Sequence, residues 1–506
     1  MRRLAVLSAV LAGLLVAAAP AAAKPKERLF MVGAAKALTN PTAGERLCLG
    51  GYGSCPDGGG RTMTGIRDDM YARAIAVSGK GNDLILVHTT NIGLFASYKA
   101  DGVGIYHLRQ EVARRTGVPA DHVIVQADHS HSGPDTIGIW GGVPESWLRY
   151  LQSQAVEAAV DAYEARRPAR VYVGTADGAG ITSSYSQGPN LSTDDEFRLL
   201  WAEEKNGKRI ATLTNYSPHA TVLGSSNKGA SGDWPEWAAQ IAESRFGGVG
   251  IAGVGTLGRE DFGADESQGL DHAEAEARAR LSRMIGDATA AAQLVPAENG
   301  VDVASVYLTE PIAQPVLFLN LMPEGAVDAG GYDISIDRDT RAPWLKGEAL
   351  GTYAGAARIG DVFFGMSPGE PFPQIQEYLR EEGGVTGARA HFHLGATNDF
   401  LGYMVRPVEH YPQVLVEGAG YLLGCPEEEI LVRSGLPYDE ACTDHWTLMV
   451  SPTIGSHVAC TIQDAATSVG FTSGRRDDAC DALTLLDGVG APPEENGAVV
   501  TPLGAS

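Results

Sequence analysis

The pattern of hydrophobic and polar positions along the chain predicts strands before it predicts anything else. Residues 74–90, AIAVSGKGNDLILVHTT, are two β-rich runs around a Gly-Lys-Gly-Asn turn, and this pattern predicts a hairpin. The continuous apolar run HVIVQAD, residues 122–128, predicts a buried strand. Two further runs, FRLLWAEE and KRIATLTNYS, flank Asn206 and Gly207 and predict a second hairpin.

Helical spacing alternates with these strands. Residues 144–166 place Leu148, Leu151 and Ala155 on one face, and Pro144 suits a first helical turn. Residues from about 236 to 244 and the alanine-rich stretch 270–295 also predict helices. Strands return in VDVASVYLTEPI and ARIGDVFFGMSPGEP. The chain is therefore expected to be an α/β protein with mixed β-sheets and flanking helices.

The first residues have the pattern of an export signal. Arg2 and Arg3 precede an apolar run and then small residues that end in an A-x-A site. We expect residues 1–23 to be a signal peptide removed near Ala23, so that the protein is secreted; an uncleaved anchor is the alternative. No other run of about 18 apolar residues occurs, and no stable membrane insertion is expected.

The net charge excludes one class of partner. With 39 Lys and Arg against 62 Asp and Glu, the formal net charge is -23. Such a balance repels nucleic acid and attracts cations, so we expect no nucleic-acid partner. A structural Ca²⁺ or Mg²⁺ at an acidic loop is left open.

Six cysteines in an exported chain predict disulfides. Cys48 and Cys55 enclose LGGYGS, whose glycines allow a tight bridged loop. Four more cysteines allow three pairings that the sequence does not rank. They are Cys425, Cys442, Cys460 and Cys480. A composition change near residue 420 predicts a main domain over 24–420 and a disulfide-tied extension with a loose tail over 421–506.

Two histidines at the end of the predicted strand 122–128 are the first candidates for chemistry. His129 and His131 alternate on what should be extended backbone, so both rings can face one cleft. Alone, H-x-H is more often structural than metal-binding. The metallo-β-lactamase pattern H-x-H-x-D-H fails, because Gly133 and Pro134 occupy its last two positions.

Two more residues have comparable positions. His219 ends an apolar run where Pro218 stops strand pairing. Glu370, between Pro-Gly and Pro after a buried strand, either caps the next element or coordinates an ion.

Six segments in order, between about Met31 and Tyr411, resemble the neutral, non-lysosomal ceramidases, which are zinc amidases that cleave the N-acyl bond of ceramide. The most specific is ADHSHSGPD, which is similar to the family's H-T-H-S-G-P. The others are MVGAAKALTNP, GIRDDMYARAIAV, NYSPHATVLGSSNKGASGDWPEW, PGEPF and TNDFLGYMVRPVEHY.

This resemblance implies a ligand set and a reaction. His129, His219, Glu370 and Tyr403 would hold one Zn²⁺ per chain, in a ceramidase-like catalytic domain. The resemblance also implies that His131 and His129 are the catalytic pair. In this pair His131 would hydrogen-bond the attacking water or the tetrahedral intermediate. Zinc-activated water would then cleave an N-acyl amide, as in a ceramide-like lipid.

Some neighbouring residues have two interpretations. Asp233 either positions a group behind the ligands or caps a helix. His88 ends a strand beside the expected site, where it could support a ligand. His391 and His393 repeat the H-x-H spacing, but core packing or support of a ligand fits them better than ligation.

The departures from the family concern the substrate side. Gly258 stands where the family has a serine, which excludes an acyl-serine mechanism at that position. Residues 182–190, TSSYSQGPN, lack the family's arginine, and Leu415 or Val416 replaces a tyrosine. A zinc-dependent esterase or lactonase, or a secreted binding protein that retained the metal site, are therefore alternatives to the amidase.

Overall fold

The computed structural model describes most of the chain between residues 27 and 502. The described residues are 27–42, 45, 47–53, 55, 61–98, 100–184, 192–311, 348–381, 384–405, 453–474, 480 and 500–502. The predicted signal peptide, the domain boundary at 420 and two of the cysteines, Cys425 and Cys442, lie outside them.

The larger sheet has nine strands and is mostly antiparallel, with parallel pairs β4–β5 and β9–β11. The short strand β13 (Gln293–Leu294) pairs with β6. The other strands, in sheet order, are β11 (Val249–Val254), β9 (Arg209–Tyr216), β8 (Glu196–Glu203), β6 (Arg167–Asp177), β1 (Phe30–Leu38), β3 (Tyr71–Gly79), β4 (Asn82–Thr89) and β5 (Val123–Ala127).

A second sheet packs face to face with the first. Its order is β14 (Val301–Pro311), β15 (Glu348–Ile359), β16 (Val362–Met366) and β19 (Ala390–Leu394), and β22 (Val500–Pro502) pairs with β15. One buried cluster joins the two sheets, and in it Phe30 and Leu86 of the first meet Phe364 and Phe392 of the second. Short strand pairs complete the set. They are β2 (Gly65–Ile66) with β10 (Gly229–Ala230), β7 (Thr182–Ser184) with β12 (Glu260–Phe262), β17 (Glu370–Pro371) with β20 (Tyr403–Met404), and β18 (Val385–Thr386) with β21 (Thr472–Ser473).

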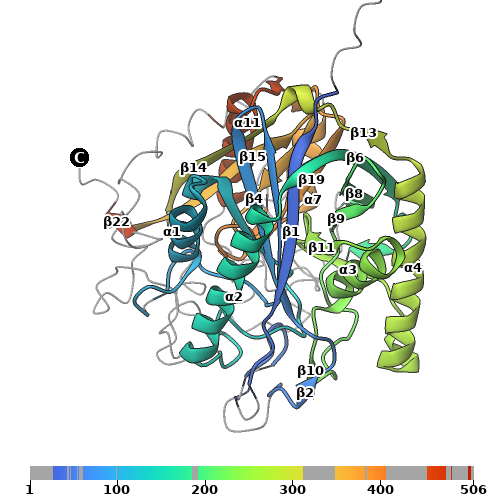
Figure 1. The fold of residues 1–506 in the computed structure, drawn as a ribbon. Coiled ribbons are helices and arrows are strands. Elements are labelled where there is room, and N and C mark those ends of the chain that lie inside the picture. Colours follow the sequence, from blue (N-terminus) through green and yellow to red (C-terminus); the bar gives the residue numbers. More distant parts are fainter. Residues whose placement is uncertain are drawn as a thin grey trace, which may run out of the picture.

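Helices cover both outer faces, which gives four layers in the order helix, sheet, sheet, helix (Figure 1). The first face carries α1 (Ile105–Thr116), α2 (Glu145–Glu164), α3 (Asp233–Phe246) and α4 (Leu270–Ala290). The second carries α7 (Pro373–Arg380) and α11 (Ile454–Ser468). Short 3-10 turns, η2 (Ala120–His122), η3 (Glu266–Gln268) and η4 (Ala297–Asn299), lie in the connections.

The structure confirms the predicted α/β class and most of the predicted elements. Both hairpins, the strand at 123–127 and the helix after Pro144 are present. Helix α3 begins at Asp233, three residues earlier than expected. The sequence analysis did not predict α1 or α11. Among the described residues, no helix is both long and apolar enough to cross a bilayer.

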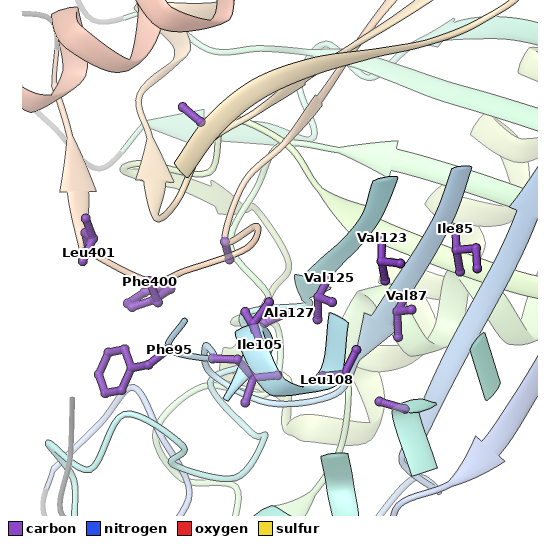
Figure 2. Packing of buried hydrophobic residues seen from close by; sticks show 14 of the residues in the cluster. Ile85, Val87, Phe95, Ile105, Leu108, Val123, Val125, Ala127, Phe400 and Leu401 are labelled. Carbon is purple, nitrogen blue, oxygen red and sulfur yellow. The ribbon is translucent and has the colours of Figure 1, made fainter. Parts of the chain in front are cut away.

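Helix α1 is fixed to the edge of the larger sheet by aliphatic packing. Figure 2 shows Ile105 and Leu108 beside Val87 of β4 and Val125 of β5. Phe95 and Phe400 extend the same cluster. Burying each such side chain contributes roughly 1.5–3 kcal/mol, so the loops that begin and end here are firmly anchored.

The described residues include two disulfides. The predicted Cys48–Cys55 bridge is confirmed, and its two sulfurs lie against Gly141, whose added Cβ would approach them. The second bridge, Cys460–Cys480, starts on α11. Because α11 packs on β14 and β15, this part of the predicted C-terminal extension is attached to the second sheet.

Close approach of α2 to β1 gives a test of the layer packing. A Cβ added at Gly33 would lie 2.1 Å from the Ala162 carbonyl oxygen of α2. We expect Gly33→Ala to reduce the free energy of unfolding by about 1–3 kcal/mol, because backbone must shift to admit the methyl group. Gly65→Ala, where no atom lies within 4 Å, is the matched control. Equal urea midpoints for the two variants would contradict this packing.

Candidate metal centre

Loops at the ends of β5 and β9 bring three histidines together. His129 follows β5 and His219 follows β9. Main-chain pairing holds the loops side by side, because Ser130 and Ala220 form a parallel bridge and the His131 amide donates to the Ala220 carbonyl at 3.0 Å. Residues 90 apart in sequence therefore share one site.

The three rings offer nitrogen atoms to a common space. Ligand atoms of His129, His131 and His219 all lie within 4.8 Å of one another, and the Nε2 atoms of His129 and His131 are 3.4 Å apart. His129 and His219 are buried, whereas His131 is half-buried. The rings converge as expected, but the cause differs from the one predicted. His129 has a φ of 53°, so a left-handed turn and not an extended strand places the two rings together.

The main chain orients two of the rings. Nδ1 of His129 donates to the Ile92 carbonyl at 2.6 Å, and Nδ1 of His219 donates to the Glu260 carbonyl at 3.0 Å. A carbonyl oxygen can only accept, so the proton sits on Nδ1 in both rings. In the neutral rings, each Nε2 then presents a lone pair to the site.

Glu370 completes this arrangement. Its Oε2 lies 3.0 Å from Nε2 of His219 and 3.4 Å from Nε2 of His129. Three acceptors thus face one another, which requires either protons on the rings or a cation between them. Glu370 opens β17, and the N-cap of α7 is Phe372 with no side-chain cap bond, so the capping interpretation of Glu370 is not what the structure shows.

Electrostatics within the centre follow from the same contacts. Burial favours the neutral form of both His219 and Glu370, but their mutual contact outweighs it, raising the pKa of His219 and, with His129, holding the pKa of Glu370 well below its usual value. Burial, together with repulsion from the other two rings, holds the pKa of His131 well below its usual value. His131 is therefore neutral at neutral pH.

Tyr403 lies beside this group through strand pairing. Tyr403 pairs directly with Glu370 in the parallel β17–β20 ladder. This pairing directs both side chains to the same face of the ladder. The Tyr403 ring is buried, and its centroid is 6.5 Å from that of His219. The described structure thus brings near one another the five residues that the sequence predicted as metal ligands or catalytic groups.

An arginine that the sequence analysis did not predict fixes the loop that holds His131. The Nη1 of Arg61 donates to the carbonyls of Gly50 at 2.8 Å and His131 at 2.6 Å. Its Nε and Nη2 donate to the Asn227 carbonyl. One guanidinium therefore ties three loops, and no short motif in the sequence marks it.

Two aromatic rings cover the histidines. The Tyr52 ring meets His131 edge-on at a centroid distance of 4.9 Å. The neighbouring Gly51 has no room for a side chain, since a Cβ would lie 2.2 Å from the His131 ring. Phe400 stacks on His129 at 5.2 Å and 17°. The bridged Cys48–Cys55 loop thus forms the wall next to His131.

Asp233 supports the loop that follows His219. Its buried carboxylate accepts from the amides of Val222 at 3.1 Å and Leu223 at 2.9 Å, and burial raises the pKa of Asp233 to about 7. It is the first residue of α3, with a φ of 54°. Its carboxylate also accepts a hydrogen bond from the amide of Trp234 in its own helix.

Two other histidines considered in the sequence analysis, His88 and His393, have the surroundings of structural residues. His88 is buried on β4, neither ring nitrogen has a hydrogen-bond partner in the described structure, and burial lowers its pKa to about 3. His393 contacts Ser367 Oγ at 2.7 Å and Gln376 at 3.3 Å. At Gly258 a Cβ would lie 2.4 Å from the Phe372 ring, so no nucleophilic side chain fits there.

Comparison with known proteins gives consistent matches. Two Dictyostelium discoideum proteins are similar in sequence over 211 residues each, neutral ceramidase B at 25% identity (38% of this chain, 29% of the relative) and neutral ceramidase A at 23% (37% and 29%). A neutral ceramidase from Pseudomonas aeruginosa shares the fold, with a TM-score of 0.58 at 17% identity over 81% of this chain and 75% of that chain. This chain is neutral ceramidase-like.

A second solved structure, described as a ceramidase complexed with C2, has a TM-score of 0.60 at 16% identity and covers 89% of this chain and 78% of that chain. No protein-family model matches the sequence. The ceramidase-like chain matches less than a third of the length of its two curated relatives.

The Arg61 contacts generate a stability prediction. We expect Arg61→Gln to lower the free energy of unfolding by at least about 2 kcal/mol, because three buried carbonyls lose charge-assisted donors. Arg170→Gln, which removes an exposed ion pair to Glu27, is the control and should cost no more than about 1 kcal/mol. Chemical denaturation measures both, and similar losses would contradict the role of Arg61.

Proposed function

We propose that this ceramidase-like chain is a zinc-dependent hydrolase that cleaves the N-acyl amide bond of a ceramide-like lipid. The observation that supports the proposal most directly is the convergence of the Nε2 atoms of His129 and His219 with a carboxylate oxygen of Glu370. Three mutually repelling acceptors in a buried space are stabilised by a cation.

The donor set suits zinc. Two neutral imidazoles held by second hydrogen bonds, a carboxylate and a phenol oxygen are ligands that Zn²⁺ accepts, and the Nδ1 contacts to main-chain carbonyls are typical of zinc-binding histidines. In this proposal His129, His219, Glu370 and Tyr403 hold the ion. When bound, zinc supplies Lewis-acid polarisation of a carbonyl and activation of water at neutral pH.

His131 differs from the other two histidines in ways that suit proton handling. The Nδ1 atom of His131 is buried without a hydrogen-bond partner in the described structure, so no carbonyl fixes the tautomer of the ring. As a whole residue, His131 is the most exposed of the three histidines. A neutral imidazole donates a hydrogen bond through one ring nitrogen and accepts a proton at the other, so it can handle a substrate oxygen or nitrogen. We therefore assign His131 to proton transfer with the substrate and His129 to coordination of the zinc ion.

The chemistry proceeds without an enzyme-bound acyl group at Gly258, because the Phe372 ring occupies the space a side chain would need. Water is then the nucleophile. Secretion, with cleavage near Ala23, belongs to the same proposal, and the Cys48–Cys55 bridge fits an oxidising compartment.

Metal retention tests the ligand assignment. His129→Ala, His219→Ala and Glu370→Gln should each lose at least about tenfold in zinc affinity, because each removes one ligand atom from a four-ligand set. His131→Ala should keep about one zinc per chain. Elemental analysis after gel filtration measures the content and would also detect a structural Ca²⁺ or Mg²⁺.

The matched control for this measurement is His272→Ala, an exposed histidine on α4. Full zinc retention in all three ligand variants would refute the proposed zinc site. Zinc loss in His131→Ala as well would show that His131 is a ligand and would overturn the division of roles.

A substrate panel tests the reaction. We expect a fluorogenic ceramide or another N-acyl amide to be hydrolysed, with loss of turnover under a chelator and recovery on adding zinc. His131→Ala should lower kcat by about 100-fold or more with zinc retained, as for removal of a general acid or base.

Two other results identify the alternatives. Turnover of esters or lactones with the amides inert would favour an esterase or lactonase, which the altered residues around the substrate leave open. Zinc binding without hydrolysis of any substrate would indicate a binding protein.

A further inference from the structure

A cavity of about 250 Å³ lies between the start of α1, the turn η2 and β15. None of its lining residues belongs to the metal centre. The residues that matter for its chemistry are Ile105, Tyr106, Arg109, Asp121, Tyr353 and Asn398.

Arg109 is a buried cation that forms no ion pair within the described part of the chain; Asp121, in the same cavity lining, acts on it only through longer-range attraction. Its side chain is only 7% exposed, and its Nε donates to the Ala120 carbonyl at 2.7 Å. Within the described part of the chain, the two terminal nitrogens make no hydrogen bond and no ion pair. The guanidinium instead lies 5.7 Å from the centre of the Tyr353 ring. Because a buried unpaired charge is costly, this arrangement favours an anionic ligand in the cavity.

Asn398 adds a second unused donor. It is 3% exposed and has a φ of 63°, a conformation asparagine tolerates. Its Oδ1 accepts from the Val125 amide at 3.0 Å, which orients the side chain and leaves the Nδ2 group without a partner among the described residues. Both donors line the same cavity, so it is suited to bind an oxygen acceptor.

The rest of the lining limits the charge and shape of that ligand. Asp121 lies exposed at the rim, so with Arg109 the cavity carries no net charge, and a single negative charge suits it better than a phosphate dianion. Tyr106, Tyr353 and Ile105 supply aromatic and apolar walls. A planar carboxylate matches the paired donors of a guanidinium.

We propose that this cavity binds the carboxylate of a small organic acid with an apolar body. Arg109 and the Asn398 amide hold the carboxylate, and the tyrosines and Ile105 contact the body. The site does not depend on the proposed hydrolase function. It does lie behind the loop that carries Phe400, which stacks on His129, so its occupant contacts the same loop that covers the metal centre.

Isothermal titration calorimetry of the full chain with benzoate tests the proposal. Benzamide, nearly the same in shape but uncharged, is the control ligand. We expect benzoate to bind with a dissociation constant at or below about 1 mM and at least about tenfold more tightly than benzamide. Arg109→Gln should weaken benzoate binding at least about tenfold, because it removes the charge.

Asn398→Asp is a second variant that keeps the Oδ1 contact to Val125 and places a negative charge in the cavity. It should also abolish benzoate binding. Arg114→Gln, on the exposed side of the same helix, should bind benzoate as the native chain does. Circular dichroism reports whether each variant is folded.

Three outcomes would overturn the site. They are no benzoate binding by the native chain up to about 10 mM, equal binding of benzoate and benzamide, and undiminished benzoate binding by either folded variant. The comparison of the two ligands on the native chain holds even if a variant fails to fold.

Discussion

The centre depends on two hydrogen bonds from ring nitrogens to main-chain carbonyls. Ile92 and Glu260 accept from the Nδ1 atoms of His129 and His219, so each Nε2 is left as a bare lone pair. The Glu370 carboxylate faces the same space. Without those carbonyls either ring could turn its proton toward Glu370 and form an ordinary buried hydrogen bond, and the reason to bind a cation would be gone.

This geometry survives only because rigid elements hold the loops that carry it. The bridge between Ser130 and Ala220 joins the loops after β5 and β9, and the Arg61 guanidinium ties the bridged Cys48–Cys55 loop to His131. Asp233 holds the amides that follow His219. These contacts place the proposed metal ligands and His131 on supports that are themselves buried, as the proposed catalysis by positioned groups would require.

The three histidines differ in how they are held, and the roles proposed for them rest on this difference. His129 and His219 are locked by carbonyls and buried, whereas His131 keeps an unpartnered Nδ1 and partial exposure. The same loop system also connects to the Arg109 cavity through Asn398 and Phe400. The side of the molecule around α1 therefore carries a charged group without an ion pair and a hydrogen-bond donor without a partner among the described residues.

Local patterning made the elements predictable. Both hairpins, the strand before His129 and helices α2 and α4 follow from turn residues and from apolar spacing that the sequence displays directly. The sequence analysis missed helix α1 because Arg109 interrupts the apolar face of the helix. Arg109 is buried through contacts with Ala120 and Tyr353, which lie outside the helix. Helix α11 is buried along most of its length, and it lies in the segment that the sequence analysis assigned to a C-terminal extension.

The sequence by itself determined the residue types of the centre and their order along the chain, since the strand ends, His129, His219 and Glu370 are all visible as motifs. Only the tertiary structure decided which atoms face one another. The left-handed turn at His129 orients its ring, and the carbonyls that fix two rings, the Arg61 hydrogen bonds and the contact of Arg109 with Tyr353 join segments tens to hundreds of residues apart. Such contacts arise only when the layers pack together, so they cannot be predicted from the local pattern of hydrophobic and polar residues.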